Sequence, residues 1–257
     1  MKAILQKTIP YNPLEEKKLP GIQPLAPDGW LAADDAYAGQ MAERERLLST
    51  RRDEVLRLDA SAMAAAQELL QMALDAMDSG AEDAALRLDG VRVAVDWEDP
   101  LGTLGRIAQQ DFCILEKPDG AEEHVLTGAV LCFPASWTLA EKFMRPLTGI
   151  HVPVDSYDAG IAARVQRLFD GVQAGRPLWR FNALWYRDPA LYQPRSQYAP
   201  REKPDASRAG FLRSEKQVIL RLPQTRAVVF AIHTHVLAWA DVMRQWGPRQ
   251  EDPAARP

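Results

Sequence analysis

Three stretches near the C-terminus alternate polar with apolar side chains, and this alternation limits the fold more than any other feature of the chain. They read "PLWRFNALWYRD" (177–188), "AGFLRSEKQVILRLP" (209–223) and "RAVVFAIHTHVLAW" (226–239). A period of two residues, with many β-branched and aromatic side chains, predicts β-strands. The connection "LPQTRA" between the last two is short enough to predict an antiparallel hairpin.

Further strand candidates lie in the middle of the chain. "DFCILEK" (111–117) and "EEHVLTGAVLCFP" (122–134) flank the turn sequence "KPDG", in which Pro118 presets φ and Gly120 accepts a positive φ. These two runs predict a second hairpin. "VRVAVDW" (91–97) is rich in β-branched residues and predicts one more strand.

Helical patterns dominate the first third of the chain. "AYAGQMAERERLLSTRRDEVLRL" (36–58) and "ASAMAAAQELLQMALDAM" (60–77) are rich in Ala, Glu, Arg and Leu, and they predict two helices joined near Asp59. The Met and Leu stripe of the second is typical of core packing. Two shorter helices are predicted later, one opened by the capping box at 138–141 and one over 159–172.

The predicted fold class is α+β, with N-terminal helices followed by an antiparallel sheet of about five strands and intervening helices. We expect sequential strand pairing, and the order of hairpin, helices and strands is PAS-like. Residues 1–34 are rich in Pro and Gly and predict an extended arm, with Trp30 docked on the rest of the protein. Residues 35–245 are expected to form a single domain, and 246–257 a disordered tail.

Composition excludes several classes of function. The chain has 257 residues, a formal net charge of -4 and 31 scattered basic residues, so it carries no footprint for nucleic acid or an anionic membrane. Two cysteines, Cys113 and Cys132, cannot form a four-thiolate metal site or an internal iron–sulfur cluster, and they suggest no disulfide framework. No run approaches the ~18 apolar residues of a membrane span, and we expect a cytoplasmic protein.

His151, one of four histidines, stands in the unusual stretch "LTGIHVPVDSY" (147–157). Gly149 precedes it by two residues and Pro153 follows by two, a pattern that predicts a fixed loop between the two shorter helices. A histidine held in this way is either a packed structural residue or a ligand.

A polar stripe runs along the predicted strand 209–223, because its odd positions share one face: Arg213, Glu215, Gln217 and Arg221. One interpretation is a solvated outer face on which Arg213 and Glu215 pair weakly. The other is a carboxylate in a pocket. In the strand before it, Trp179, Phe181 and Trp185 are expected to point toward the core, while Arg180 and Asn182 point the other way and could line the same site.

His233 and His235 share a strand face two residues apart, and such a pair can bind one metal ion. No third ligand stands at an obvious spacing in the sequence, which counts against a metal site. His124 follows two glutamates near a turn and is expected to be exposed. Phosphate loops, dinucleotide fingerprints and nucleophile elbows do not occur in the sequence.

Five segments in order resemble the heme-dependent oxidative N-demethylase family. They are "YNPLEEKKLPGIQPLAPDGWL", "LLSTRRDEVL", "PASWTLAEKFMRPLTGIHVPVDSY", "RFNALWYRDPALYQP" and "LRSEKQVILRLPQTRAVVFAIHTHV". The resemblance implies a PAS-like domain that binds heme b and oxidises a small methylated amine. It also implies that the protein uses O2 and takes electrons from a separate flavin and iron–sulfur protein.

The resemblance also implies roles for particular residues. His151 matches the histidine of the family's "IH-x-PV" segment, which implies that it is the iron ligand. Glu215 matches an Arg-x-Glu stripe, which implies a buried carboxylate that pairs with a protonated secondary amine beside Arg213 and Asn182. Further cofactor-binding residues are expected at Lys142, Arg145, Arg180 and Tyr157.

The chain departs from the family's pattern in its last strand. An arginine and a tyrosine are expected where His233 and His235 stand, and a further C-terminal helical segment is short or missing. The main functional hypothesis is oxidative N-demethylation of a small secondary amine. The altered strand keeps open a non-catalytic heme-binding sensor or interaction module, and a structural protein without heme is a third possibility.

Overall fold

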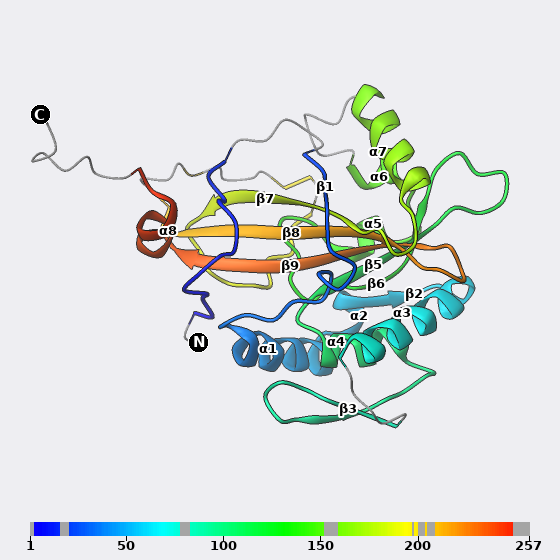
Figure 1. Ribbon diagram of the computed structural model, residues 1–257, viewed down its shortest axis with the longest axis horizontal. Helices are drawn as coiled ribbons and strands as arrows, with labels where there is room; N and C mark the ends of the chain where they lie inside the picture. The colour runs from blue at the N-terminus through cyan, green and yellow to red at the C-terminus, as the bar shows by residue number, and fades with distance from the viewer. Residues whose placement is uncertain are drawn as a thin grey trace, which may run out of the picture.

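The protein is built around one antiparallel sheet with helices on both faces (Figure 1). The computed structural model describes residues 3–15, 21–77, 83–151, 159–196, 198–199, 204 and 209–248, without the side chains of residues 151, 159, 161 and 162. Seven strands form the sheet in the order β1-β7-β8-β9-β5-β6-β2. They are β1 (Gln23–Pro24), β2 (Leu56–Leu58), β5 (Asp111–Glu116), β6 (Val125–Val130), β7 (Leu178–Tyr186), β8 (Phe211–Arg221) and β9 (Val228–Ala238).

The α+β class and the helices-first order are confirmed, and five of the strands are the predicted ones. Two short strands that the sequence did not predict, β1 and β2, extend the sheet at its two edges. The predicted sequential pairing is wrong at one point. β9 pairs with β5, so β6 and β7 lie near opposite edges of the sheet. The chain between them crosses one face of the sheet through three helices.

The helices are α1 (Tyr37–Thr50), α2 (Arg52–Val55), α3 (Met63–Ala76), α4 (Pro100–Ile107), α5 (Leu139–Lys142), α6 (Leu147–His151), α7 (Ala159–Gly171) and α8 (Trp239–Trp246), with a 3-10 turn at Ala60–Ala62. The first predicted helix is therefore too long, because residues 56–58 pair with β6 as a strand. None of the described helices is both long and apolar enough to cross a membrane.

Helix α4 was not predicted from the sequence, although a start signal is present. Asp99 caps the helix by accepting a hydrogen bond from the Gly102 amide, and Pro100 occupies the first turn. Gly105 allows α4 to pack closely, since a Cβ there would meet Val130 Cγ2 at 2.8 Å. The run "VRVAVDW" does not join the main sheet: β4 (Arg92–Ala94) pairs only with β3 (Ala84–Leu86) in a small separate hairpin.

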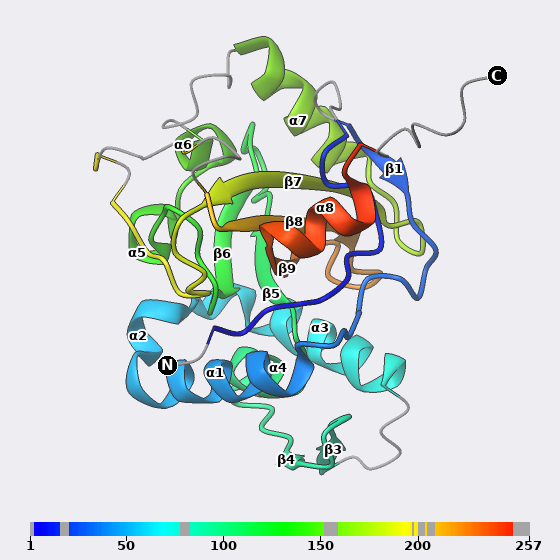
Figure 2. The same ribbon diagram turned by 90° about the vertical axis from the view of Figure 1, so that its left-hand side faces the viewer.

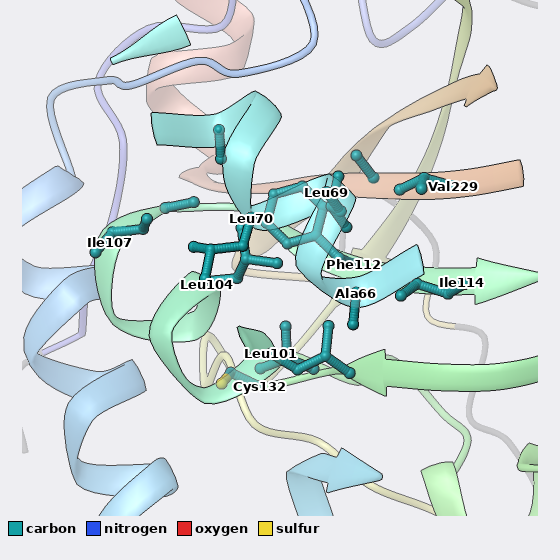
Figure 3. Close-up of a cluster of buried hydrophobic side chains, with 14 of the residues drawn as sticks. Ala66, Leu69, Leu70, Leu101, Leu104, Ile107, Phe112, Ile114, Cys132 and Val229 are labelled. Atoms are coloured by element: carbon teal, nitrogen blue, oxygen red, sulfur yellow. The ribbon is translucent and has the colours of Figure 1, made fainter. Parts of the chain in front are cut away.

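The main core lies between the sheet and the N-terminal helices. Figure 3 shows leucines of α3 and α4 converging on Phe112 and Ile114 of β5 and Val229 of β9. Trp30 of the arm joins the same core and meets Phe112 edge-on, with 6.1 Å between the ring centroids. The prediction that Trp30 docks on the domain is thus correct.

A second apolar cluster covers the opposite face of the sheet. Alternate residues of the strands, including Cys113 of β5, Ile219 of β8 and Ile232 of β9, pack there against α5, α6 and α7. His124 also lies on this side and is only 3% exposed, with its ring against Phe169. The expectation that His124 is exposed was wrong, because α7 covers the turn in which it stands.

The N-terminal arm runs along β9 and beside α8 (Figure 2). The Gln6 amide donates to the Val236 carbonyl oxygen at 2.9 Å, and the Ile9 amide donates to the side chain of Gln245 in α8. The arm thereby covers the end of the sheet that carries the two C-terminal histidines.

Candidate functional site

A row of three polar side chains crosses β7, β8 and β9. Asn182 lies opposite Glu215, and Glu215 lies opposite Thr234. Directly paired residues of neighbouring strands place their side chains on the same face, so the three form one row. Glu215 alternates with Ile219 along β8, and Ile219 belongs to the cluster under α5 to α7. The row therefore lies on the sheet face that α6 and α7 cover.

Glu215 is a largely buried carboxylate with one oxygen bonded and one free among the described residues. Oε2 accepts hydrogen bonds from Asn182 Nδ2 at 3.1 Å and from Gln217 Nε2 at 3.0 Å. Oε1 lies 3.9 Å from Arg213 Nε, which is too long for a hydrogen bond. The side chain is 12% exposed. The polar stripe is thus not a solvated outer face.

Arg213 is held by backbone carbonyls rather than by Glu215. Its guanidinium donates to the Leu191 carbonyl oxygen at 2.9 Å and to the Phe133 carbonyl oxygen at 2.6 Å. Its Nε is buried and has no hydrogen-bond partner among the described residues. Arg213 therefore contributes a fixed positive charge beside Glu215.

Arg180 supplies a second, half-buried charge on the same strand as Asn182. Its Nε is buried without a hydrogen-bond partner in the described part of the chain. Burial lowers the pKa of Arg180, and the charge of Glu215 partly opposes this shift. Arg180 and Asn182 line a cavity of about 330 Å³ between β7 and the arm, together with Leu14 and Trp185. An anionic group bound in this cavity would give Arg180 Nε a hydrogen-bond acceptor.

Thr234 completes the row with an unused hydroxyl. It is 1% exposed, and its Oγ1 has no hydrogen-bond partner among the described residues. A buried hydroxyl without a partner carries a free-energy cost, which a hydrogen-bonding ligand would remove. Reasoning from the sequence did not single out Thr234. The available signal was the alternation of side chains along its strand, which puts Thr234 on the same face of the sheet as Glu215.

The other predicted cofactor residues lie nearer β6. The predicted loop at His151 is wrong in detail, since residues 147–151 form α6, in which His151 is the last residue. The Leu126 amide donates to the Arg145 carbonyl oxygen, so this segment runs beside β6. The Lys142 side chain is buried, and burial lowers its pKa, whereas Arg145 is exposed.

Tyr157 and the side chain of His151, which are both expected to bind heme, lie outside the described residues. α6 itself packs on the cluster that contains Ile219 and Ile232, through Leu147 and Ile150. The backbone of His151 is therefore on the same face of the sheet as Glu215.

His233 and His235 do meet a third candidate ligand. Asp34 of the arm places Oδ2 2.8 Å from His233 Nε2 and 3.8 Å from His235 Nε2. The sequence did not indicate this partner, because Asp34 is 199 residues away from His233 along the chain. Only the path of the arm over β9 brings them together.

Burial and hydrogen bonding shift the charges of this cluster. Burial raises the pKa of Asp34, but hydrogen bonds from His233, Gln109 and Gln6 outweigh it and hold the pKa below its usual range. Burial, reinforced by the neighbouring His233, holds the pKa of His235 well below its usual value. Asp34 is thus ionised and His235 neutral near neutral pH.

A match over most of the chain identifies the family. A family model described as "Haem-dependent oxidative N-demethylase, alpha subunit-like" matches residues 21–250. The chain belongs to this family. The matched range contains the Asn182, Glu215 and Thr234 row, Arg180 and the segment around His151.

The residues present fit the heme that this family's description names. The free Nε of Arg180 is a buried cationic donor suited to a propionate, and the surrounding face is apolar through residues such as Phe230 and Ile232. A histidine is a common axial ligand of heme iron. The donor set of this face is therefore consistent with a heme-dependent member of the family.

Proposed function

We propose that the protein carries out heme-dependent oxidative N-demethylation of a small secondary amine, using O2 and electrons from a separate flavin and iron–sulfur reductase. The observation that supports this most directly is the Glu215 carboxylate, which is 12% exposed and in which Oε1 has no hydrogen bond among the described residues. A protonated amine is the kind of ligand that this oxygen would bind.

The row of side chains accounts for the choice of amine. A secondary ammonium carries two N–H groups, and Glu215 Oε1 accepts one of them. The Thr234 hydroxyl, which is free among the described residues and lies on the adjoining strand, accepts the other. Asn182 and Gln217 keep the carboxylate in place. Because the site is buried, the ion pair is worth more than the ~0 to 1 kcal/mol of an exposed pair.

The chain would hold heme b with residues from both ends of the site. His151 at the end of α6 would bind the iron, and Arg180 would bind a propionate, with Lys142, Arg145 and Tyr157 as further contacts. When bound, the heme supplies the activation of O2 and the oxidation of the C–H bond next to nitrogen. The protein orients the ammonium and excludes water from the carboxylate.

The test is a turnover assay on the heme-loaded chain with a supplied reductant and dimethylamine. We expect one formaldehyde and one methylamine for each O2 reduced, and we expect trimethylamine, whose ammonium has a single N–H, to bind more weakly. A folded, heme-loaded protein that releases no formaldehyde from any secondary amine would contradict the enzymatic proposal.

The alternative is a heme-binding sensor or interaction module without turnover. It is favoured by one observation, namely that the last strand places His233 and His235 where the family resemblance implies an arginine and a tyrosine. A spectral response to amines without formaldehyde release would select this alternative.

A further inference from the structure

Three side chains that the proposed heme chemistry does not use converge at the start of the domain. Asp34, His233 and His235 each offer one ligand atom, and these atoms lie within 4.8 Å of one another. Both histidines are 3% exposed, and their ring centroids are 4.6 Å apart. Two histidines and one carboxylate form a donor set that binds Zn²⁺ and Fe²⁺.

The hydrogen bonds around His235 place its ring proton on Nδ1, so Nε2 carries a lone pair that accepts no hydrogen bond among the described residues. The Ser214 hydroxyl donates to the Asn182 carbonyl oxygen at 2.6 Å, so it accepts from the Tyr11 hydroxyl at 3.0 Å. Tyr11 has then used its only proton and accepts from His235 Nδ1 at 3.4 Å. The lone pair of His235 Nε2 consequently faces the Asp34 carboxylate. Asp34 Oδ2 also accepts a hydrogen bond from Gln6 Nε2 at 2.9 Å, and a cation bound between Oδ2 and His235 Nε2 would remove the repulsion between their lone pairs.

The cluster also has the outer contacts that metal ligands use. Gln109 Nε2 and the Ala36 amide fix the second oxygen of Asp34, and Tyr11 fixes the ring of His235. A surface cavity of about 480 Å³ lies at Asp34 and is also lined by Asp35. It gives a cation an entrance with a negative lining.

We propose that Asp34, His233 and His235 bind one divalent first-row transition metal ion, which fastens the N-terminal arm to β9. The ion takes the place of the proton that His233 Nε2 now donates to Asp34 Oδ2. That proton moves to Nδ1 of the same ring. The amide of Gln110, which now donates to Nδ1 at 2.8 Å, turns to present its oxygen. This site is separate from the heme and does not depend on the proposed N-demethylation.

The site is tested with Zn²⁺ as the probe on the full-length, heme-loaded chain. After chelator treatment, the protein is dialysed against a series of free Zn²⁺ concentrations, and zinc and iron are counted per chain by elemental analysis. We expect one zinc per chain in addition to the heme iron, and a thermal unfolding midpoint that rises with the Zn²⁺ concentration. Asp34→Asn, which keeps the shape of the side chain, should weaken zinc binding by at least about 100-fold.

His235→Gln supplies a second ligand variant in case Asp34→Asn does not fold. The control is His124→Gln, because His124 is equally buried but lies on the opposite face of the sheet. The control should bind zinc as the wild type does. Folded wild-type protein that takes up no zinc, or zinc binding that is the same in wild type, Asp34→Asn and His235→Gln, would overturn the proposal.

Discussion

Asn182 on β7 donates a hydrogen bond of 3.1 Å from Nδ2 to Oε2 of Glu215 on β8. Gln217 donates to the same oxygen, so two amides share one side of the carboxylate. Oε1 has no hydrogen bond among the described residues, and Arg213 Nε is 3.9 Å from it. A ligand with an N–H group can therefore bind Glu215 without displacing either amide.

Glu215→Gln should retain heme and fold but lose amine binding. The amide keeps the size of the side chain and removes the charge that attracts an ammonium. A hydrogen bond to a charged group is worth about 1.5–3 kcal/mol, so we expect the affinity for dimethylamine to fall by roughly 10- to 100-fold. Spectral titration of the ferric, heme-loaded protein with dimethylamine measures this change in affinity.

The matched control for that variant is Glu116→Gln. Glu116 is a carboxylate of the same sheet, on β5, and its partner is the Thr127 hydroxyl. It should bind dimethylamine as the wild type does. Superimposable titration curves for wild type and Glu215→Gln would remove Glu215 from the site.

Arg180→Gln should weaken the retention of heme. The variant removes the half-buried cation that we assign to a propionate, and the loss of one charge-assisted hydrogen bond predicts roughly 10-fold faster transfer of heme to apomyoglobin. Arg92→Gln, in the separate β3 and β4 hairpin, is the control. Equal transfer rates for Arg180→Gln and wild type would place the propionates elsewhere.

His151→Ala should abolish stoichiometric heme binding and leave the chain folded. The chain should stay folded because the substitution removes a bond to the heme iron rather than a packed core side chain. The Soret band measures binding, and added imidazole should restore part of it by filling the vacated position. A full Soret band with an unchanged spin state in the variant, without imidazole, would contradict the assignment of His151 as the ligand.

His124 should make the protein less stable as the pH falls. Burial lowers its pKa below 6.5, although Gln166 and Asp170 partly compensate. The folded chain then binds fewer protons at this residue than the unfolded chain does below about pH 6.5, so stability is lost as the pH falls. Urea unfolding between pH 7 and pH 5 should give wild type a steeper decline than His124→Gln, by up to about 1.4 kcal/mol per pH unit. Parallel declines would show that the pKa is not lowered.

Arg44→Met should be strongly destabilising. Arg44 and Asp111 form an ion pair of 2.6 Å between α1 and β5, with side chains 0% and 1% exposed. Removing the arginine leaves a buried carboxylate without its counter-ion, which costs about 3–5 kcal/mol. Urea unfolding measures the loss. Arg51→Met breaks an exposed pair with Glu54 and should cost less than about 1 kcal/mol.

The sequence by itself determined the class of the fold and the identity of the family. Alternation along the stretches 177–188, 209–223 and 226–239 predicted β7, β8 and β9, because a side-chain period of two reports a half-buried strand directly. The same alternation placed Arg213, Glu215 and Gln217 on one face. It left open whether that face is solvated, since local periodicity does not report what covers a sheet.

Only the tertiary structure decided which residues meet. The pairing of β9 with β5, the packing of the helices α5 to α7 on the sheet face that carries Glu215 and the approach of Asp34 to His233 all join segments that are far apart in the chain. Local propensity carries no information about such contacts. They are chosen by the free energy of burying both faces of one sheet at once, which depends on the whole chain.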